Sequence, residues 1–272
     1  MTDYLDKFRL DGITAFVMGG LGLIGREVSI AFCSSGAKTI IFDQENEEAE
    51  VFVRDIKRQG YDVHFRPFDC SDMEQLEHNF SNQLNEFGYP HVFINCSYPQ
   101  SIDWGKSSFK EITLASFRKN VDIHMNSYAW LARLAANAMV EAGNGGSVIQ
   151  LGSIYGIVGQ DLTIYEGTDI HENMTYAAIK GGITNLTRQM ASYYGQFNIR
   201  VNTICPGGLQ GHMAGRSNTQ EPRFVEQYIK KTPLKRMGSA DEVASTALFL
   251  ACNASSYISG SSIVVDGGWT II

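Results

Sequence analysis

The sequence predicts an α/β fold in which helices cover both faces of one parallel sheet. Short apolar runs alternate with longer amphipathic stretches along the whole chain. The runs are continuously apolar, as in strands that are buried on both faces. A glycine-rich turn also joins the first apolar run to the first helical stretch. Right-handed crossovers would arrange such strands in a doubly wound sheet, whose ligands bind beyond the carboxyl ends of the strands.

The expected elements follow one another without a repeat or a linker. The expected strands are Ile13–Met18, Lys38–Asp43, Asp62–Phe68, His91–Asn95, Ser147–Leu151, Ile199–Ile204 and Ser262–Val265. The expected helices are Gly22–Ser35, Glu45–Gln59, Asp72–Phe87, Ser116–Glu141, Met174–Gln196 and Ala240–Cys252. Gly36 and Gly60 follow the first two helices, where glycine is favoured.

Composition limits the classes of function. The 272 residues suit one large domain or two small ones, and 22 basic against 29 acidic residues give a net charge of −7. This balance argues against nucleic-acid and anionic-membrane partners, which favour basic patches. No apolar run approaches the roughly 20 residues of a membrane helix, and the first ten residues lack the apolar core of a secretion signal. We therefore expect a cytoplasmic protein. Its five widely spaced cysteines predict reduced thiols, and no metal site is expected.

A phosphate-binding turn is expected after the first strand. Gly19, Gly22 and Gly25 have the spacing G-x-x-G-x-x-G, and Leu23 and Ile24 lie between the last two glycines. Glycines allow a tight turn and a close approach of the backbone, and the following helix offers free N–H groups to a pyrophosphate. Glycines that only shape a turn are the alternative, but the strand before and the helix after favour a nucleotide.

Polar residues at the ends of the second and third strands are candidates for adenosine contacts. Asp43 is placed to accept both ribose hydroxyls and to repel a 2′-phosphate, and no basic residue at the strand end would receive one. We therefore expect NAD(H) rather than NADP(H), with a helix-capping Asp43 as the alternative. Asp69 and Cys70 are expected near the adenine, although Asp69 serves equally well as a cap for the helix expected at Asp72.

Tyr176 and Lys180 are four residues apart in an expected helix and so share one face. A neighbouring ammonium lowers the pKa of a phenol, which would suit Tyr176 to general acid–base catalysis. Ser153 follows a strand end, where its hydroxyl can stabilise charge on the same substrate oxygen. A surface Tyr–Lys pair is the alternative, and the conjunction with a nucleotide-binding turn favours catalysis.

Together these motifs resemble the short-chain dehydrogenase/reductase family over almost the full chain. The matching segments are Gly19–Gly25, Asp43, Asp69, 94–97, 152–156, 176–180, 200–202, 205–208 and 265–268. The resemblance implies a single domain with a seven-stranded Rossmann-type sheet, a nicotinamide cofactor, and hydride transfer at a carbinol or carbonyl carbon.

The resemblance also implies roles for individual residues. Tyr176 would be the acid/base, and Lys180 would bind the nicotinamide ribose and lower the pKa of Tyr176. Ser153 would orient the substrate. The cofactor side would further include Asn95, Cys96, Pro206 and Gly207, with Gly208 next to the substrate.

The sequence departs from the family pattern after the fourth expected strand and in the long helix. Tyr98 stands where the family usually has glycine, so we expect it to contact substrate. The family's catalytic Asn position falls near His124, with Asn120 one turn earlier. Either His124 takes the role or the register is displaced by a turn, and a structural core histidine is the remaining alternative.

The sequence also departs from the family pattern between Ser153 and Tyr176, which are 23 positions apart, more than is common in the family. The added residues form an expected substrate loop at about 157–174, in which Tyr165 and Glu166 are substrate candidates. Tyr155, just before this loop, is a further substrate candidate. A surface insertion or an oligomer contact is the alternative, as is a loose metal cluster around His171. Residues 208–231 are expected to form a mobile lid, with His212 and Arg216 as candidates for a substrate anion.

The expected activity is NAD-dependent oxidation or reduction at a carbon of a carbohydrate, polyol or sugar-nucleotide substrate. Segments 153–156, 164–167, 175–180 and 206–208 resemble oxidoreductases of bacterial flagellin-glycosylation and nonulosonic acid pathways. A reductase of 3-oxoacyl compounds or small ketones is one alternative, and a non-catalytic NAD-binding protein is another. The family resemblance also implies a homodimer or homotetramer.

Overall fold

The computed structural model describes residues 3–45, 47–211 and 220–272. Its centre is a parallel seven-stranded sheet with the order β3-β2-β1-β4-β5-β6-β7, which confirms the predicted doubly wound fold. The strands are β1 (Thr14–Met18), β2 (Lys38–Asp43), β3 (Val63–Pro67), β4 (Val92–Asn95), β5 (Gly146–Leu151), β6 (Ile199–Pro206) and β7 (Ser262–Val265). The order reverses between β1 and β4, where open α/β sheets bind ligands.

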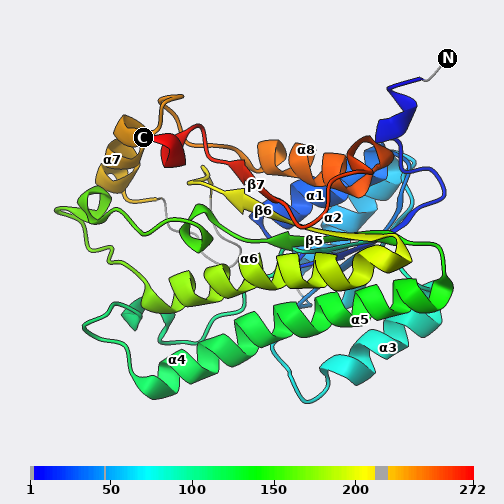
Figure 1. Cartoon of the computed structure of the whole chain (residues 1–272), viewed down its shortest axis with the longest axis horizontal. Coiled ribbons are helices and arrows are strands. Elements are labelled where there is room, and N and C mark those ends of the chain that lie inside the picture. The colour runs from blue at the N-terminus through cyan, green and yellow to red at the C-terminus, as the bar shows by residue number, and fades with distance from the viewer. Residues whose placement is uncertain (1–2, 46, 212–219) are drawn as a thin grey trace.

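Helices form one layer on each side of the sheet. They are α1 (Leu23–Ser34), α2 (Glu47–Arg58), α3 (Leu76–Phe87), α4 (Leu114–Asn120), α5 (Ser127–Ala142), α6 (Met174–Tyr194), α7 (Pro222–Lys231) and α8 (Ala240–Ala251). Figure 1 shows α3, α5 and α6 on one side and α1, α2 and α8 on the other. The helix α7 lies apart from both layers, beyond the end of the sheet.

Two hydrophobic cores explain why the strands are apolar throughout. Along β1, Ala15 and Val17 pack into the core that includes residues of α1 and α8. Phe16 and Met18 point the other way, into the core shared with α3, α5 and α6. Alternate side chains of a strand face opposite sides, so a sheet covered on both sides needs apolar residues at every position.

Two predicted helices differ from the observed ones. The helix expected from Asp72 begins at Leu76, because residues 69–75 form turns held by Asp69 and Asp72. The helix expected over Ser116–Glu141 is interrupted by a π-helical segment, Val121–Asn126, between α4 and α5. Segments of π-helix are rare in proteins, and many of those that occur lie at functional sites.

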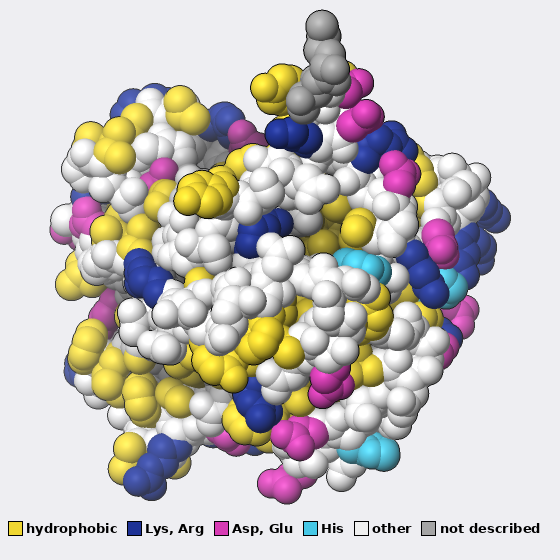
Figure 2. Space-filling model, turned by 45° about the vertical axis from the view of Figure 1, so that its right-hand side comes forward, with side chains coloured by type: hydrophobic (Ala, Val, Ile, Leu, Met, Phe, Trp, Pro, Cys, Tyr) yellow, Lys and Arg dark blue, Asp and Glu magenta, His cyan; other side chains and the backbone are white. Residues whose placement is uncertain are grey.

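The surface shows no strong segregation of charge in the view of Figure 2. Lys and Arg side chains are scattered there among acidic and uncharged ones. Among the described residues, no helix is both long and apolar enough to cross a membrane.

Candidate active site

A cleft of about 630 Å³ lies beyond the carboxyl ends of the central strands. Most of the predicted site residues line it: Gly19, Gly22, Leu23, Ile24, Asp43, Asp69, Cys70, Cys96, Tyr98, Ser153, Tyr155, Tyr165, Tyr176, Lys180, Pro206, Gly207 and Gly208. Gly25, Asn95, His124 and Glu166 do not line it. The cleft therefore gathers predicted residues from eight separate segments of the chain.

The glycine turn brings the start of α1 to the cleft wall. Gly19 has φ +72°, and a Cβ there would lie 2.5 Å from the Ser97 backbone nitrogen. A Cβ on Gly25 would lie 2.0 Å from the carbonyl oxygen of Gly19, so Gly25 packs α1 against the turn and does not line the cleft. Gly22 is the N-cap of α1 and no side chain caps the helix, whose first turn also lacks acidic residues. Free N–H groups of this kind fit a pyrophosphate.

Asp43 holds the glycine turn from the end of β2. Its Oδ2 accepts a hydrogen bond from the Leu21 N–H at 2.9 Å, and its Oδ1 accepts one from the Gln44 N–H. Burial raises the pKa of the Asp43 carboxyl, and these two hydrogen bonds oppose the rise. The carboxylate lines the cleft and does not cap α2, which begins at Glu47.

The next two strand ends supply the floor of this half of the cleft. Asp69 accepts hydrogen bonds from the Ser71 N–H and hydroxyl, so it does not cap α3 as the alternative prediction had it. Asn95 is fully buried, and its Oδ1 accepts from the Ser97 N–H and hydroxyl, so it shapes the turn after β4. Burial raises the pKa of Cys70 to about 11 and that of Cys96 further. Both thiols are therefore protonated at neutral pH.

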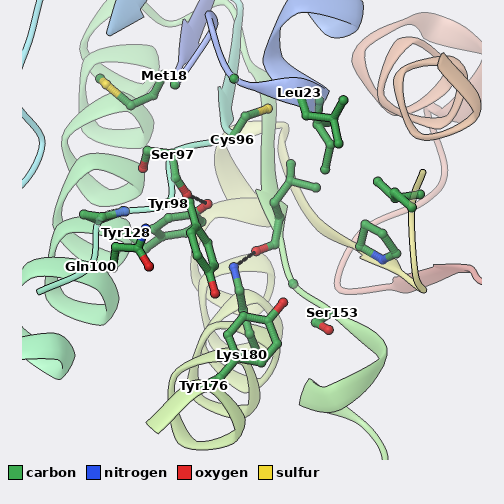
Figure 3. A pocket seen from close by; sticks show the side chains of 18 of the residues that line it. Met18, Leu23, Cys96, Ser97, Tyr98, Gln100, Tyr128, Ser153, Tyr176 and Lys180 are labelled. Carbon is green, nitrogen blue, oxygen red and sulfur yellow. Dashed lines mark hydrogen bonds between the residues drawn. The ribbon is translucent and has the colours of Figure 1, made fainter. Parts of the chain in front are cut away.

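Tyr176 and Lys180 lie one turn apart near the start of α6, and Ser153 faces them from the turn after β5 (Figure 3). The start of α6 is fixed by its N-cap, Asn173, whose Oδ1 accepts the Tyr176 N–H at 2.7 Å. The Ser153 turn can lie close to α6 because Gly156 has no Cβ. A Cβ there would lie 2.6 Å from the Lys180 carbonyl oxygen. One helix cap and one glycine thus set the separation of the three side chains.

The charges of this group differ from the sequence-based expectation. Burial raises the pKa of Tyr176, and the nearby Ser153 hydroxyl partly opposes this. Burial also lowers the pKa of Lys180 to about 7, and its Nζ donates to the Leu151 carbonyl oxygen at 2.8 Å. The expected lowering of the Tyr176 pKa does not appear in this geometry, because burial outweighs the opposing hydrogen bond of Ser153. Tyr176 is a protonated phenol at neutral pH.

His124 lies one layer behind the cleft wall, in the π-helical segment. Its ring is fully buried, 5.2 Å from the Tyr98 ring and 5.3 Å from the Tyr128 ring between centres. Burial holds its pKa well below the usual range. Asn120 accepts a hydrogen bond from the Ser101 N–H through Oδ1 and donates one to the Ser101 hydroxyl through Nδ2. Its side chain does not reach the cleft either. The His124 ring does not line the cleft, because Tyr98 and Tyr128 stand in front of it, and its assignment to the family's Asn role stays a prediction.

The expected substrate loop forms part of the far wall. Its short helical turn, Leu162–Tyr165, buries Ile164 and directs Tyr165 into the cleft. The next residue, Glu166, follows the end of this turn and is exposed, so it is corrected from a substrate contact to a surface residue. Among the described residues, no cluster of metal-binding side chains is present at His171 or elsewhere.

The helix α7 is joined to this loop by several contacts. The Tyr165 and Phe224 rings stack with centres 6.0 Å apart, and Gln227 Nε2 donates to the Ile164 carbonyl oxygen at 2.8 Å. Tyr228 accepts the Gly208 N–H at 2.6 Å. In the predicted lid, residues 208–231, the helix α7 is therefore attached both to the substrate loop and to the segment that follows β6. His212 and Arg216 lie outside the described residues.

Several cleft residues were not singled out from the sequence: Gln100, Tyr128, Gln220, Phe224 and Tyr228. They come from the long connection after β4, from α5, from α7 and from the residues just before α7. No local motif marks them, because only tertiary packing brings them to the wall. The aromatic content of α7 was the one available signal.

Comparison with known proteins identifies the family. A family model described as "Enoyl-(Acyl carrier protein) reductase" matches residues 22–270. The chain belongs to the short-chain dehydrogenase/reductase family, whose members bind a nicotinamide cofactor. It is an oxidoreductase that acts on CH–OH groups.

Individual relatives extend over the whole chain. It is 30% identical to the galactitol 2-dehydrogenase (L-tagatose-forming) of Cereibacter sphaeroides, with 99% of each chain covered. It is 26% identical to the post-translational flagellin modification protein A of Campylobacter coli, covering 96% of this chain and 99% of that one. The crystal structure of gox2181 has a TM-score of 0.88 and 26% identity, covering 99% and 100%.

Proposed function

We propose that the protein is an NAD-dependent oxidoreductase that acts on a hydroxyl or keto carbon of a carbohydrate, polyol or sugar-nucleotide substrate. The observation that carries the proposal is the convergence of Ser153, Tyr176 and Lys180 on the same cleft as the glycine turn and Asp43. Relatives named as galactitol dehydrogenases support a hydroxyl-rich substrate.

NAD suits the residues of the cofactor half. The uncapped first turn of α1 would bind the pyrophosphate, and the Asp43 carboxylate would accept the ribose hydroxyls. A 2′-phosphate would face the negative charge of the partly buried Asp43. Asp69 and Cys70 would lie against the adenine, and Pro206 and Gly207 with Cys96 against the nicotinamide.

The nicotinamide would accept or deliver the hydride. In reduction, Tyr176 would donate its phenolic proton to the oxygen of the substrate carbonyl, and in oxidation its phenolate would accept the proton from the alcohol. Ser153 would donate a hydrogen bond to the same oxygen and stabilise its developing charge. Lys180 would donate to the nicotinamide ribose and, once charged, stabilise the phenolate of Tyr176.

A panel assay tests the proposal. Purified protein with NAD(H) or NADP(H) would be offered hexitols, sugars, sugar nucleotides and 3-oxoacyl thioesters, and nicotinamide absorbance would be followed. We expect turnover with NAD and a polyol or sugar. Turnover restricted to oxoacyl thioesters would contradict the substrate class, and cofactor binding without any turnover would indicate a non-catalytic protein.

We further propose that the protein is a cytoplasmic homodimer or homotetramer. Trp130 on α5 and Tyr193 on α6 support the self-association, because both are large, hydrophobic and exposed on the outer helices. Sedimentation should give a multiple of 30.1 kDa, and a monomer mass would contradict it.

A further inference from the structure

The substrate half of the cleft is lined by phenols and amides rather than by charges. Tyr98, Tyr155 and Tyr165 surround Tyr176 there, and Gln100 lies nearby. Among the described lining residues the charged ones are Asp43, Asp69 and Lys180, all assigned above to the cofactor or the catalytic group. The described wall offers no side-chain charge of its own to a substrate anion.

Two of these phenols form a pair. The Tyr155 and Tyr165 hydroxyls are near enough to affect each other's pKa, and burial raises the pKa of both, so both stay protonated. The Tyr155 ring meets the Tyr176 ring edge-on with centres 6.5 Å apart. As protonated phenols, each of the two can donate one hydrogen bond and accept others. A group that both donates and accepts, such as an alcohol, satisfies the two together.

The pair is held in place by neighbouring aromatic rings. The Tyr165 ring stacks on Phe224 of α7 with the ring planes 4° apart, and the Tyr155 ring packs edge-on against Trp269. The added residues between Ser153 and Tyr176 bring Tyr165 to this position. Fixed donors and acceptors discriminate more strongly than mobile ones, because an analogue that lacks the matching group leaves them unpaired.

We propose that the Tyr155–Tyr165 pair binds a second hydroxyl of the substrate, on the carbon next to the one that Tyr176 serves. The site is then specific for a neutral vicinal diol, as polyols and sugars present. The edge-on packing of the Tyr155 ring against the Tyr176 ring places the pair beside the catalytic group. The inference rests on the proposed function and adds the group that selects the substrate.

The test compares matched alcohols. The ratio of kcat/KM for 1,2-cyclohexanediol to that for cyclohexanol, with NAD, isolates the second hydroxyl. We expect the wild type to favour the diol and Tyr155→Phe or Tyr165→Phe to lower this ratio about tenfold each. Phe224→Leu should lower it in the same direction, because it frees the Tyr165 ring. Tyr257→Phe, at a fully exposed position, is the matched control.

The dissociation constant for NADH, measured by fluorescence, checks that each variant folds, and it should not change. An unchanged diol-to-monoalcohol ratio in both tyrosine variants would overturn the inference and leave the proposed function intact. The inference would also be overturned if the wild type oxidised hexitols but did not favour 1,2-cyclohexanediol over cyclohexanol. The absence of turnover with every alcohol and polyol would instead contradict the proposed function itself.

Discussion

The Lys180 ammonium donates to the carbonyl oxygen of Leu151 at 2.8 Å, and this hydrogen bond ties the first turns of α6 to the end of β5. The side chain is 3% exposed and packs among the rings of Tyr98, Tyr128 and Tyr176, with Nζ 5.0 to 5.9 Å from their centres. A positive charge in such surroundings costs free energy of desolvation, so Lys180 lowers the stability of the fold.

Lys180→Met should therefore stabilise the fold at pH 7 while it removes activity. The pKa of Lys180 is about 7 in the folded protein, against 10.5 for the free group. Between pH 7 and 10.5 Lys180 is protonated in the unfolded chain and neutral in the folded protein, so folding releases its proton. The destabilisation that results grows as the pH falls from 10.5 towards 7. We expect a gain in unfolding free energy of about 2–4 kcal/mol at pH 7, shrinking towards pH 10.

Urea unfolding at both pH values measures this gain. Lys110→Met, at an exposed position, is the control and should change little. A Lys180→Met variant less stable than the wild type at pH 7 would show that the ammonium is well solvated or paired in solution.

Ser153→Ala should shift the pH dependence of alcohol oxidation. The Ser153 hydroxyl lowers the pKa of Tyr176, which burial raises. Oxidation needs the phenolate, so its rate should rise with pH, and without Ser153 that rise should begin at a higher pH. Reduction uses the phenol and should stay flat through neutral pH. Stopped-flow rates over pH 6–10 in both directions test this, and an unmoved oxidation limb would contradict it. The hydroxyl's loss should also reduce kcat by about 10²–10³.

Asp43→Asn should weaken the preference for NADH over NADPH by about tenfold or more, since removal of one repelling charge is worth roughly 1–2 kcal/mol. Asparagine keeps an oxygen that can accept the Leu21 N–H, so the glycine turn should survive. Fluorescence titration with both nucleotides gives the ratio of dissociation constants. Asp62→Asn on the surface should leave that ratio unchanged, and an unchanged ratio in Asp43→Asn would remove Asp43 from the ribose site.

His124→Ala should act on stability more than on chemistry. The ring fills a buried space between aromatic side chains, so its removal should cost about 2–4 kcal/mol of unfolding free energy. Because Tyr98 and Tyr128 separate it from the cleft, kcat should fall far less than the about 10²–10⁴-fold expected on loss of a general acid. Chemical denaturation and steady-state kinetics separate the two effects. A loss of that full size in a folded variant would return His124 to the mechanism.

Local patterns predicted the sheet, the glycine turn and the Ser153–Tyr176–Lys180 group, because strand ends and helical spacing place these residues whatever the rest of the chain does. The remainder depends on tertiary packing. The Gly208–Tyr228 hydrogen bond joins residues with no shared motif. Helical counting found the position of His124, and only packing shows that two rings cover it. The sign of the Tyr176 pKa shift was missed for the same reason, since burial cannot be read from a four-residue spacing.

The most direct test of the account compares Tyr176→Phe with the wild type, using NAD and the polyol or sugar that the wild type oxidises best. The variant lacks one oxygen atom and keeps the ring that packs against Tyr98 and Tyr155. The account predicts a loss of kcat of at least about 10² with the NADH dissociation constant unchanged. Turnover by Tyr176→Phe at the rate of the wild type would contradict it.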